Sequence, residues 1–215
     1  QTPAREGRAV RAFPALHAPS PVHSPGRSWG LPRRALALRP AHPTDQTLAT
    51  NLAGFFAASN HRTMLGDFDR QQSAREWLGL RPAEVSRIET WEANGESMRP
   101  PKGITHVVLD TPAQFSGKRL ADMIRVSDRI LVPLQPSLFD VLATQRFLKE
   151  LSEQFGNPKK FRDTVGIVGM RVDARTKAAE QLHRFVDGLG VPVAAYLRDT
   201  QNYVHLAAHG LTLFD

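Results

Sequence analysis

Short apolar runs alternate with longer segments of helical periodicity over most of the chain, and this alternation restricts the possible folds more than any other feature. The runs do not switch between apolar and polar residues, so a strand formed by each run would be buried on both faces. Strands of this kind, separated by helices, are typical of a parallel sheet with helices on both faces. We therefore predict an α/β fold with a mostly parallel, twisted sheet.

Apolar periodicity also predicts where the elements lie. Helices are expected at residues 46–59, 73–80, 118–126, 137–155, 174–189 and 201–208. Strands are expected at residues 62–69, 106–110, 129–134, 165–172 and 191–197, with an irregular excursion over 81–103. Before the first helix, only residues 35–38 could supply a strand. In the longest helix, the hydroxyl of Ser137 is expected to cap the first turn. The apolar stripe of that helix consists of Leu138, Val141, Leu142, Leu148, Leu151 and Phe155.

Residues 1–45 differ in composition from the rest of the chain. They contain eight of the sixteen prolines and seven arginines, but only two acidic residues. Such a segment cannot bury enough apolar surface to offset its ordering entropy, so we expect residues 1–34 to be a disordered, basic segment. A basic arm for DNA, an organelle transit peptide, a solvated leader and a non-native stretch from another reading frame are all compatible with this composition.

Charge and residue usage exclude several classes of function. The chain has no cysteine, which excludes disulfides, thiolate metal sites and a cysteine nucleophile. The net charge is +7, of which residues 1–45 contribute +5, so any DNA contact in the remainder would be a local patch. The sequence contains neither a G-x-G-x-x-G dinucleotide fingerprint nor a G-x-S-x-G nucleophile elbow. No apolar run approaches the ~18 residues that a membrane span requires.

Acidic residues follow two of the predicted strands. Asp67 and Asp69 come after one apolar run, and Asp110 ends another. In open parallel sheets, ligands bind beyond the carboxyl ends of the strands, and Mg²⁺ prefers one or two carboxylates together with waters and phosphate oxygens. An aspartate in such a place is also commonly a helix or turn cap, so both interpretations remain open for each residue.

Several segments that follow one another along the chain resemble the ParA/MinD/Soj family of deviant-Walker P-loop ATPases. Residues 64–77 (MLGDFDRQQSAREW) are similar to switch I of that family, residues 106–112 (HVVLDTP) to its Walker B strand, and residues 132–137 (VPLQPS) to the next strand and turn. Residues 165–176 (VGIVGMRVDART) resemble the strand that ends beside the base, and residues 196–210 (YLRDTQNYVHLAAHG) the last strand, loop and helix. The resemblance covers residues 46–215.

The resemblance implies a P-loop NTPase-like domain over residues 35–215 that uses ATP and Mg²⁺. Asp110 would position Mg²⁺ through water, and Asp69 would be the catalytic acid near the γ-phosphate and the attacking water. Nucleotide contacts would come from Gln46, Thr47, Met170 and Arg171, with Gln46 also at the metal. Arg175 and Arg198 lie where relatives present basic residues to DNA, although a solvated surface arginine is the alternative for each.

The family also implies partners and a location. Its members dimerise around ATP, bind DNA nonspecifically as dimers, and work with a ParB-like or cargo adaptor protein to move plasmids, chromosomes or other cargo. We therefore expect a cytoplasmic, nucleoid-associated homodimer that does not enter a membrane. We expect neither the amphipathic C-terminal anchor of MinD-like membrane-cycling proteins nor the C-terminal helix of the family in this chain.

The phosphate-binding loop departs from the family pattern. Relatives read roughly K-G-G-x-G-K-[TS]-T, whereas residues 40–47 read PAHPTDQT. The motif needs glycines so that backbone N–H groups can wrap the phosphates, and a lysine to neutralise their charge. Here Ala41, His42 and Thr44 stand at the glycine positions, Asp45 stands at the lysine position, and Pro40 replaces the signature lysine. The sequence therefore predicts a ParA-family partitioning ATPase by descent with impaired ATP binding; the alternative is a non-catalytic DNA-binding or adaptor module.

Overall fold

The computed structural model describes residues 34–38, 44–68, 73–91, 100–112, 116–173 and 175–215. For residues 34–38, 44 and 45 it describes the main chain alone. All of these residues belong to the unit Leu31–Asp215. The basic segment predicted for residues 1–34 lies outside the described residues except for Arg34, which begins the first strand.

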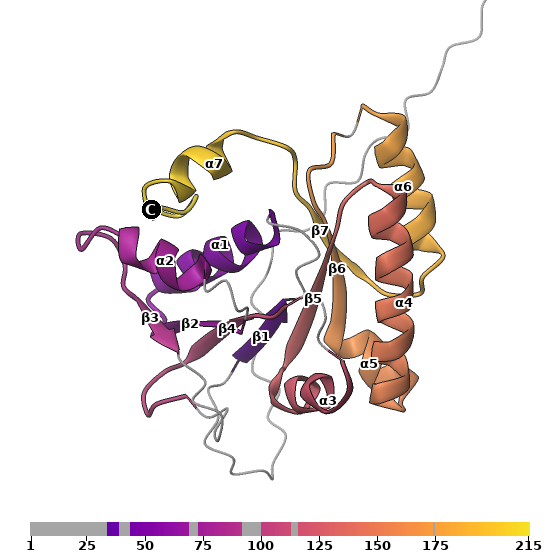
Figure 1. The fold of residues 1–215 in the computed structure, drawn as a ribbon, viewed down its shortest axis with the longest axis horizontal. Helices are drawn as coiled ribbons and strands as arrows, with labels where there is room; N and C mark the ends of the chain where they lie inside the picture. Colours follow the sequence, from indigo (N-terminus) through magenta and orange to yellow (C-terminus); the bar gives the residue numbers. More distant parts are fainter. Residues whose placement is uncertain (1–33, 39–43, 69–72, 92–99, 113–115, 174) are drawn as a thin grey trace, which may run out of the picture. The chain divides into compact units, whose positions relative to one another are not determined.

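A seven-stranded parallel sheet with the order β3-β2-β4-β1-β5-β6-β7 forms the centre of this unit (Figure 1). The strands are β1 Arg34–Leu38, β2 Thr63–Asp67, β3 Ile88–Trp91, β4 His106–Asp110, β5 Arg129–Leu134, β6 Val165–Gly169 and β7 Val193–Tyr196. Every strand pair is parallel. The predicted α/β fold with a parallel sheet is therefore confirmed.

Helices cover both faces of the sheet. The helices α1 Thr44–Ala58, α2 Ser73–Leu80 and α7 Asn202–Ala207 lie on one side (Figure 1). The helices α3 Gly117–Val126, α4 Leu138–Phe155, α5 Pro158–Thr164 and α6 Lys177–Asp187 lie on the other side. Successive strand residues point to opposite faces, so Met64 packs against the second set of helices and Leu65 against the first. Both faces of the strands are thus buried, as the uninterrupted apolar runs require.

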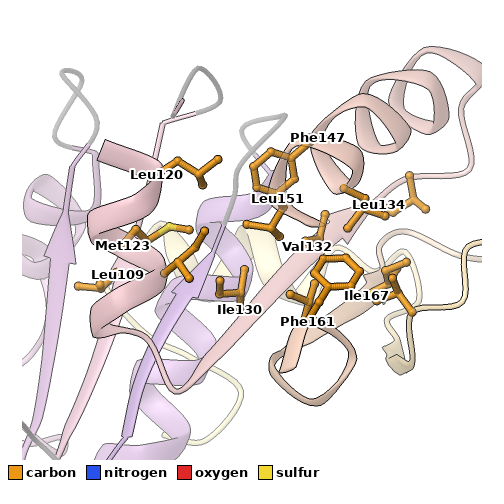
Figure 2. Packing of buried hydrophobic residues seen from close by; sticks show 14 of the residues in the cluster. Leu109, Leu120, Met123, Ile130, Val132, Leu134, Phe147, Leu151, Phe161 and Ile167 are labelled. Atoms are coloured by element: carbon orange, nitrogen blue, oxygen red, sulfur yellow. The ribbon is translucent and has the colours of Figure 1, made fainter. Parts of the chain in front are cut away.

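Figure 2 shows the core on the face covered by α3 to α6. Leu120 and Met123 of α3 and Phe147 and Leu151 of α4 point toward side chains of the central strands, and Phe161 of α5 closes the same cluster. The strand side chains in this view are Leu109, Ile130, Val132, Leu134 and Ile167. Many members of the cluster are almost fully buried, so this face is a packed hydrophobic core.

Two elements were not predicted from the sequence. Residues 81–103 contain β3, a four-residue strand at the edge of the sheet that pairs with β2 and buries Ile88 and Trp91. The prediction of an entirely irregular excursion was therefore wrong. The helix α5 was also missed, although Asn157 caps it by accepting a hydrogen bond from the N–H of Lys160 at 3.0 Å, and Pro158 occupies its first turn. The bounds of the other elements differ from expectation by three residues or fewer in the described part.

The helix α4 corrects two expectations. Ser137 does lie at the N-cap position, but its side chain makes no capping hydrogen bond. Leu138 and Leu142 were assigned to the buried stripe, yet they are 68% and 41% exposed, whereas Thr144 and Phe147 are buried. The buried side chains of the helix begin only at Thr144, so its first turn keeps apolar side chains open to solvent.

Candidate functional site

Three strands end in register at one edge of the sheet. Asp67, the last residue of β2, is the Cα partner of Asp110, the last residue of β4, and Leu38 at the end of β1 is also a partner of Asp110. We call these ends the Asp67–Asp110 edge. The chain leaves β1 at this edge and reaches α1 after only five residues, 39–43, which lie outside the described residues. Ligands of open parallel sheets bind at such an edge.

Asp67 is a helix cap. Its Oδ2 accepts a hydrogen bond from the backbone N–H of Ala74 at 2.8 Å, and Ala74 lies in the first turn of α2. The first N–H groups of a helix have no partner within the helix, and a carboxylate also interacts favourably with the positive end of the helix dipole. Of the two interpretations left open for Asp67, the cap is therefore confirmed, and the residue ties α2 to the end of β2.

Asp110 has a more buried setting. The residue is only 5% exposed, and the neighbouring Thr111 is buried as well. The backbone C=O of Asp110 accepts a hydrogen bond from the N–H of Phe68 at 2.9 Å, which holds the residue after β2 against the end of β4. Two carboxylates thus end adjacent strands, and carboxylate oxygens are the protein ligands that Mg²⁺ prefers.

The predicted nucleotide contacts on α1 lie at the beginning of that helix. Gln46 and Thr47 are half-buried in its first turn, beyond the point where the chain leaves β1. The backbone C=O of Gln46 accepts from Thr50 Oγ1 at 3.0 Å, and that of Thr47 accepts from Asn51 Nδ2 at 2.8 Å. The predicted catalytic acid, Asp69, lies outside the described residues, so its role stays a prediction.

The predicted contacts near the base differ from each other. Met170 is 3% exposed and belongs to the same hydrophobic cluster as the buried face of α1. Arg171 is exposed and adopts a left-handed backbone conformation with φ of 53°, which is uncommon for a residue other than glycine. Its guanidinium forms two hydrogen bonds of 3.1 Å with the carboxylate of Asp199, which raises the pKa of Arg171. This ion pair joins the segments that follow β6 and β7.

The two arginines predicted to contact DNA follow the carboxyl ends of the adjacent strands β6 and β7. Arg198 is exposed. The side chain of Arg175 is 89% exposed and binds the carboxylate of Asp173 through two hydrogen bonds of 3.0 and 2.9 Å. Hydrogen bonds from the side chain and backbone of Arg175 lower the pKa of Asp173 to about 2. Asp173 therefore offsets part of the positive charge of Arg175 in this structure.

Sequence reasoning did not single out a buried ion pair on the α1 and α2 side of the sheet. Arg81 and Asp215 are joined at 2.7 Å, and their side chains are 5% and 4% exposed. The two residues are 134 positions apart in the chain, and no local pattern marks them as partners.

The described residues form neither a metal-binding cluster nor a membrane-spanning helix. No group of three or more histidine, aspartate or glutamate side chains among them could hold a metal ion. His205 and His209, which are four residues apart, instead form a contact of 2.8 Å between the Nδ1 of His209 and the backbone C=O of His205. None of the helices in the described part of the chain is both long and apolar enough to cross a membrane.

The sheet order, with β1 between β4 and β5 and leading directly into α1, is that of the P-loop NTPase-like fold. Solved structures agree. The MinD protein of Aquifex aeolicus in its complex with MinC matches with a TM-score of 0.65 at 11% identity, over 83% of this chain and 86% of that one. A candidate plasmid partition protein of Borrelia burgdorferi with AMPPNP bound matches with a TM-score of 0.62 at 10% identity, over 82% and 89% of the two chains.

Sequence comparison points to the same group. The chain is 27% identical over 172 residues to the maintenance of carboxysome distribution protein A of Gloeobacter kilaueensis. The aligned residues cover 78% of this chain and 76% of that protein. No family model matches the chain. The fold is that of the ParA/MinD-type P-loop ATPases, and the resemblance of the sequence to this family is confirmed.

Proposed function

We propose that this chain is a ParA-type positioning ATPase by descent in which ATP binding is impaired. The observation that carries the proposal is the Asp67–Asp110 edge, where two acids end neighbouring strands in register beside the β1-to-α1 connection. Proteins of this fold hold phosphates at that connection and Mg²⁺ at the end of the neighbouring strand. The similarity to a carboxysome distribution protein extends the proposal to the distribution of a cellular cargo.

The residues at this edge fit one half of a magnesium–nucleotide site. Asp110, assisted by a polar residue such as Gln46 at the start of α1, supplies oxygen ligands of the type that a hydrated Mg²⁺ accepts. The phosphate half does not fit, because residues 40–45 contain no glycine and no lysine, and two of them are prolines without an N–H. An aspartate at position 45 repels a triphosphate where a lysine would attract it. We therefore derive no hydrolysis step for this chain.

Several further features belong to the same proposal. Asp69 is the candidate catalytic acid, and Thr47, Met170 and Arg171 are the candidate nucleotide contacts. The chain would act as a cytoplasmic, nucleoid-associated homodimer with a ParB-like or cargo adaptor, and it would contact DNA through Arg175 and Arg198. Met170 is buried, so it would support the nucleotide site from beneath, while Arg171 lies exposed just after the end of β6.

Isothermal titration calorimetry with Mg²⁺-ATP tests the impairment directly. We expect no binding in the micromolar range, and micromolar binding by the chain would overturn the impairment. The matched control is a restored chain carrying Pro40→Lys, Ala41→Gly, His42→Gly, Thr44→Gly, Asp45→Lys and Gln46→Thr, which is expected to bind Mg²⁺-ATP. Adding Asp110→Asn to the restored chain should remove the dependence on Mg²⁺. If the restored chain binds nothing, the proposed descent of this edge is wrong.

The alternative function is a non-catalytic DNA-binding or adaptor module. It is favoured by the excess of positive charge in residues 1–45, which carry +5 of the net charge of +7. Phosphate contacts of this kind give salt-sensitive binding that does not require nucleotide, whereas the family binds DNA in an ATP-dependent way. Gel-shift titrations with and without ATP, on the whole chain and on a chain lacking residues 1–45, separate the two functions.

A further inference from the structure

Arg81, the first residue after α2, is the centre of a buried polar cluster. A guanidinium has five N–H groups, and all five are used. The Nε and one terminal nitrogen donate to the backbone C=O of Ser86 at 3.0 and 2.8 Å, and the other terminal nitrogen donates to the C=O of Gly210 at 3.0 Å. The two terminal nitrogens also bind the carboxylate of Asp215 at 2.9 and 2.7 Å. The Arg81 side chain is only 5% exposed, so these bonds are shielded from water.

Asp215 is held from a second direction. One of its carboxylate oxygens accepts hydrogen bonds of 2.8 Å from the N–H and from the hydroxyl of Thr212. Burial by itself would raise the pKa of Asp215, but the hydrogen bonds and the charge of Arg81, together with the two bonds from Thr212, outweigh it and lower the pKa. The carboxylate is therefore ionised and fully engaged at neutral pH.

The same C-terminal segment also contacts α1. The N–H of Leu213 donates to Asn51 Oδ1 at 3.0 Å, and the Nδ2 of Asn51 donates to the C=O of Thr47 in the first turn of α1. The rings of Phe55 and Phe214 meet edge to face, with centroids 5.2 Å apart. Close approach is possible because position 54 is glycine: a Cβ there would overlap Thr212.

These contacts join two helices that start at one edge of the sheet. We propose that residues 210–215 form a latch that fastens α2, through Arg81, and α1, through Asn51, into one unit and thereby holds the beginnings of both helices in place at the Asp67–Asp110 edge. Arg81 is then a positioning residue, since it acts on the edge through α2, whose first turn is bound by Asp67. A ligand that moves the first turn of α2 therefore has to move the latch with it or break the contacts of the latch.

A buried ion pair is by itself weak support for a role in stability, because the desolvation of both charges opposes their attraction. The contacts of Arg81 indicate instead that the side chain fixes the position of α2 relative to the latch. The side chain joins the segment between α2 and β3 to the latch, and Asp215 lies 134 positions further along the chain. Gly210, with φ of 67°, lets the latch backbone pass directly against Leu80 and Arg81, where a Cβ would collide with their main chain.

The chain has no cysteine, so two introduced cysteines can be spin-labelled specifically, and the latch can be tested without added nucleotide. Spin labels are placed at Ala58→Cys on α1 and Glu76→Cys on α2, both of which are exposed, and the distance between them is measured by pulsed electron paramagnetic resonance. We expect a single narrow distribution in the parent. Arg81→Met is expected to broaden it at least about twofold, because α2 is then held only by its core contacts and by the hydrogen bond of its first turn to Asp67. Arg125→Met, which removes an exposed ion pair with Asp122 on α3, is the matched control and should change nothing.

A second variant covers the case in which Arg81→Met does not fold. Asp215→Asn keeps the size of the side chain and removes the charge that Arg81 binds, so it should broaden the distribution in the same direction. An unchanged distribution in a folded latch variant would overturn the latch, and so would equal broadening in the Arg125→Met control. Because no nucleotide is present, the result does not depend on whether the chain binds ATP, although the role at the edge rests on the proposed function.

Discussion

Asp67 and Asp110 are Cα partners at the last residues of the neighbouring parallel strands β2 and β4. Their side chains have different surroundings. Asp67 is half-buried and caps α2, whereas Asp110 is 5% exposed beside the end of β1. Asp67 holds a helix in place, whereas Asp110 lies buried at the end of its strand. Mutations of the two residues should therefore have different effects, and this difference can be measured.

Replacing Asp67 with alanine is expected to destabilise the fold by about 1 kcal/mol, because the N–H of Ala74 then loses its acceptor. Asp67→Asn keeps an oxygen at the same place and should cost less. The measurement is urea unfolding followed by circular dichroism, with the slope of the transition checked for constancy. If alanine and asparagine at position 67 gave the same loss, the cap would not be the source of the stabilisation.

Two glycines in helices should respond to alanine in opposite directions. Gly79 in α2 has open space around it, so Gly79→Ala should stabilise the protein by about 0.5–1 kcal/mol through helix propensity. Gly54 in α1 is packed against Thr212, so Gly54→Ala should destabilise it by about 1–3 kcal/mol despite the same propensity gain. Thermal unfolding of both variants tests the prediction. Thr212→Gly by itself removes the hydroxyl bonded to Asp215, but its destabilising effect should be smaller in the Gly54→Ala background than in the parent. An equal effect in both backgrounds would show that the strain lies elsewhere.

Two leucines of α4 provide a matched test of the core. Leu151 is fully buried between α4 and the sheet, so Leu151→Ala should destabilise the protein by about 2–5 kcal/mol. Leu138, on the same helix, is 68% exposed, and Leu138→Ala should change stability by no more than about 0.5 kcal/mol. Urea unfolding of both variants is the measurement. A large loss for Leu138→Ala would show that the first turn of α4 is covered in solution, contrary to the structure.

The carboxylate of Asp173 should titrate near pH 2. Its pKa is lowered to about 2 by the bonds from Arg175, so the favourable interaction is present above the ordinary carboxyl range and is lost as the pH falls through about 2. Arg175→Met should move the pKa upward toward the ordinary value of 3.8, and added salt should move it in the same direction because the pair is exposed. Carbon-detected NMR titration of the carboxyl resonance measures both shifts. A pKa that stays near 2 in Arg175→Met would assign the shift to another group.

Parts of the fold were predictable because their burial is uniform along the chain. In β4 all five residues from His106 to Asp110 are buried, and in α2 the buried side chains Ala74 and Trp77 are one helical turn apart, so the bounds of both elements were correct. β3 was missed because its two middle residues, Glu89 and Thr90, are charged or polar. It forms a strand because β2 offers a free edge for pairing. The exposure of Leu138 was missed because helical spacing cannot tell where the neighbouring elements end.

In the candidate site, too, some features were predictable from the sequence and others were not. The positions of Asp67 and Asp110 at strand ends could be read from the sequence, and capping was one of two interpretations that the sequence left open for Asp67. The burial of Met170 could not be read, because it depends on how residues that are distant in the chain pack against each other. Residues 39–43 and Asp69 lie outside the described part, so the phosphate half of the site still rests on residue types alone.

The amino-acid sequence by itself determined the parallel α/β architecture and the placement of acids at two strand tips, because burial on both faces leaves a continuous local pattern of apolar residues. Only the tertiary structure decided that Asp67 and Asp110 lie in the same register and that Arg81 meets Asp215 across 134 positions of chain. Such pairings follow from the three-dimensional packing of strands and helices, which leaves no periodic trace in the sequence around either partner.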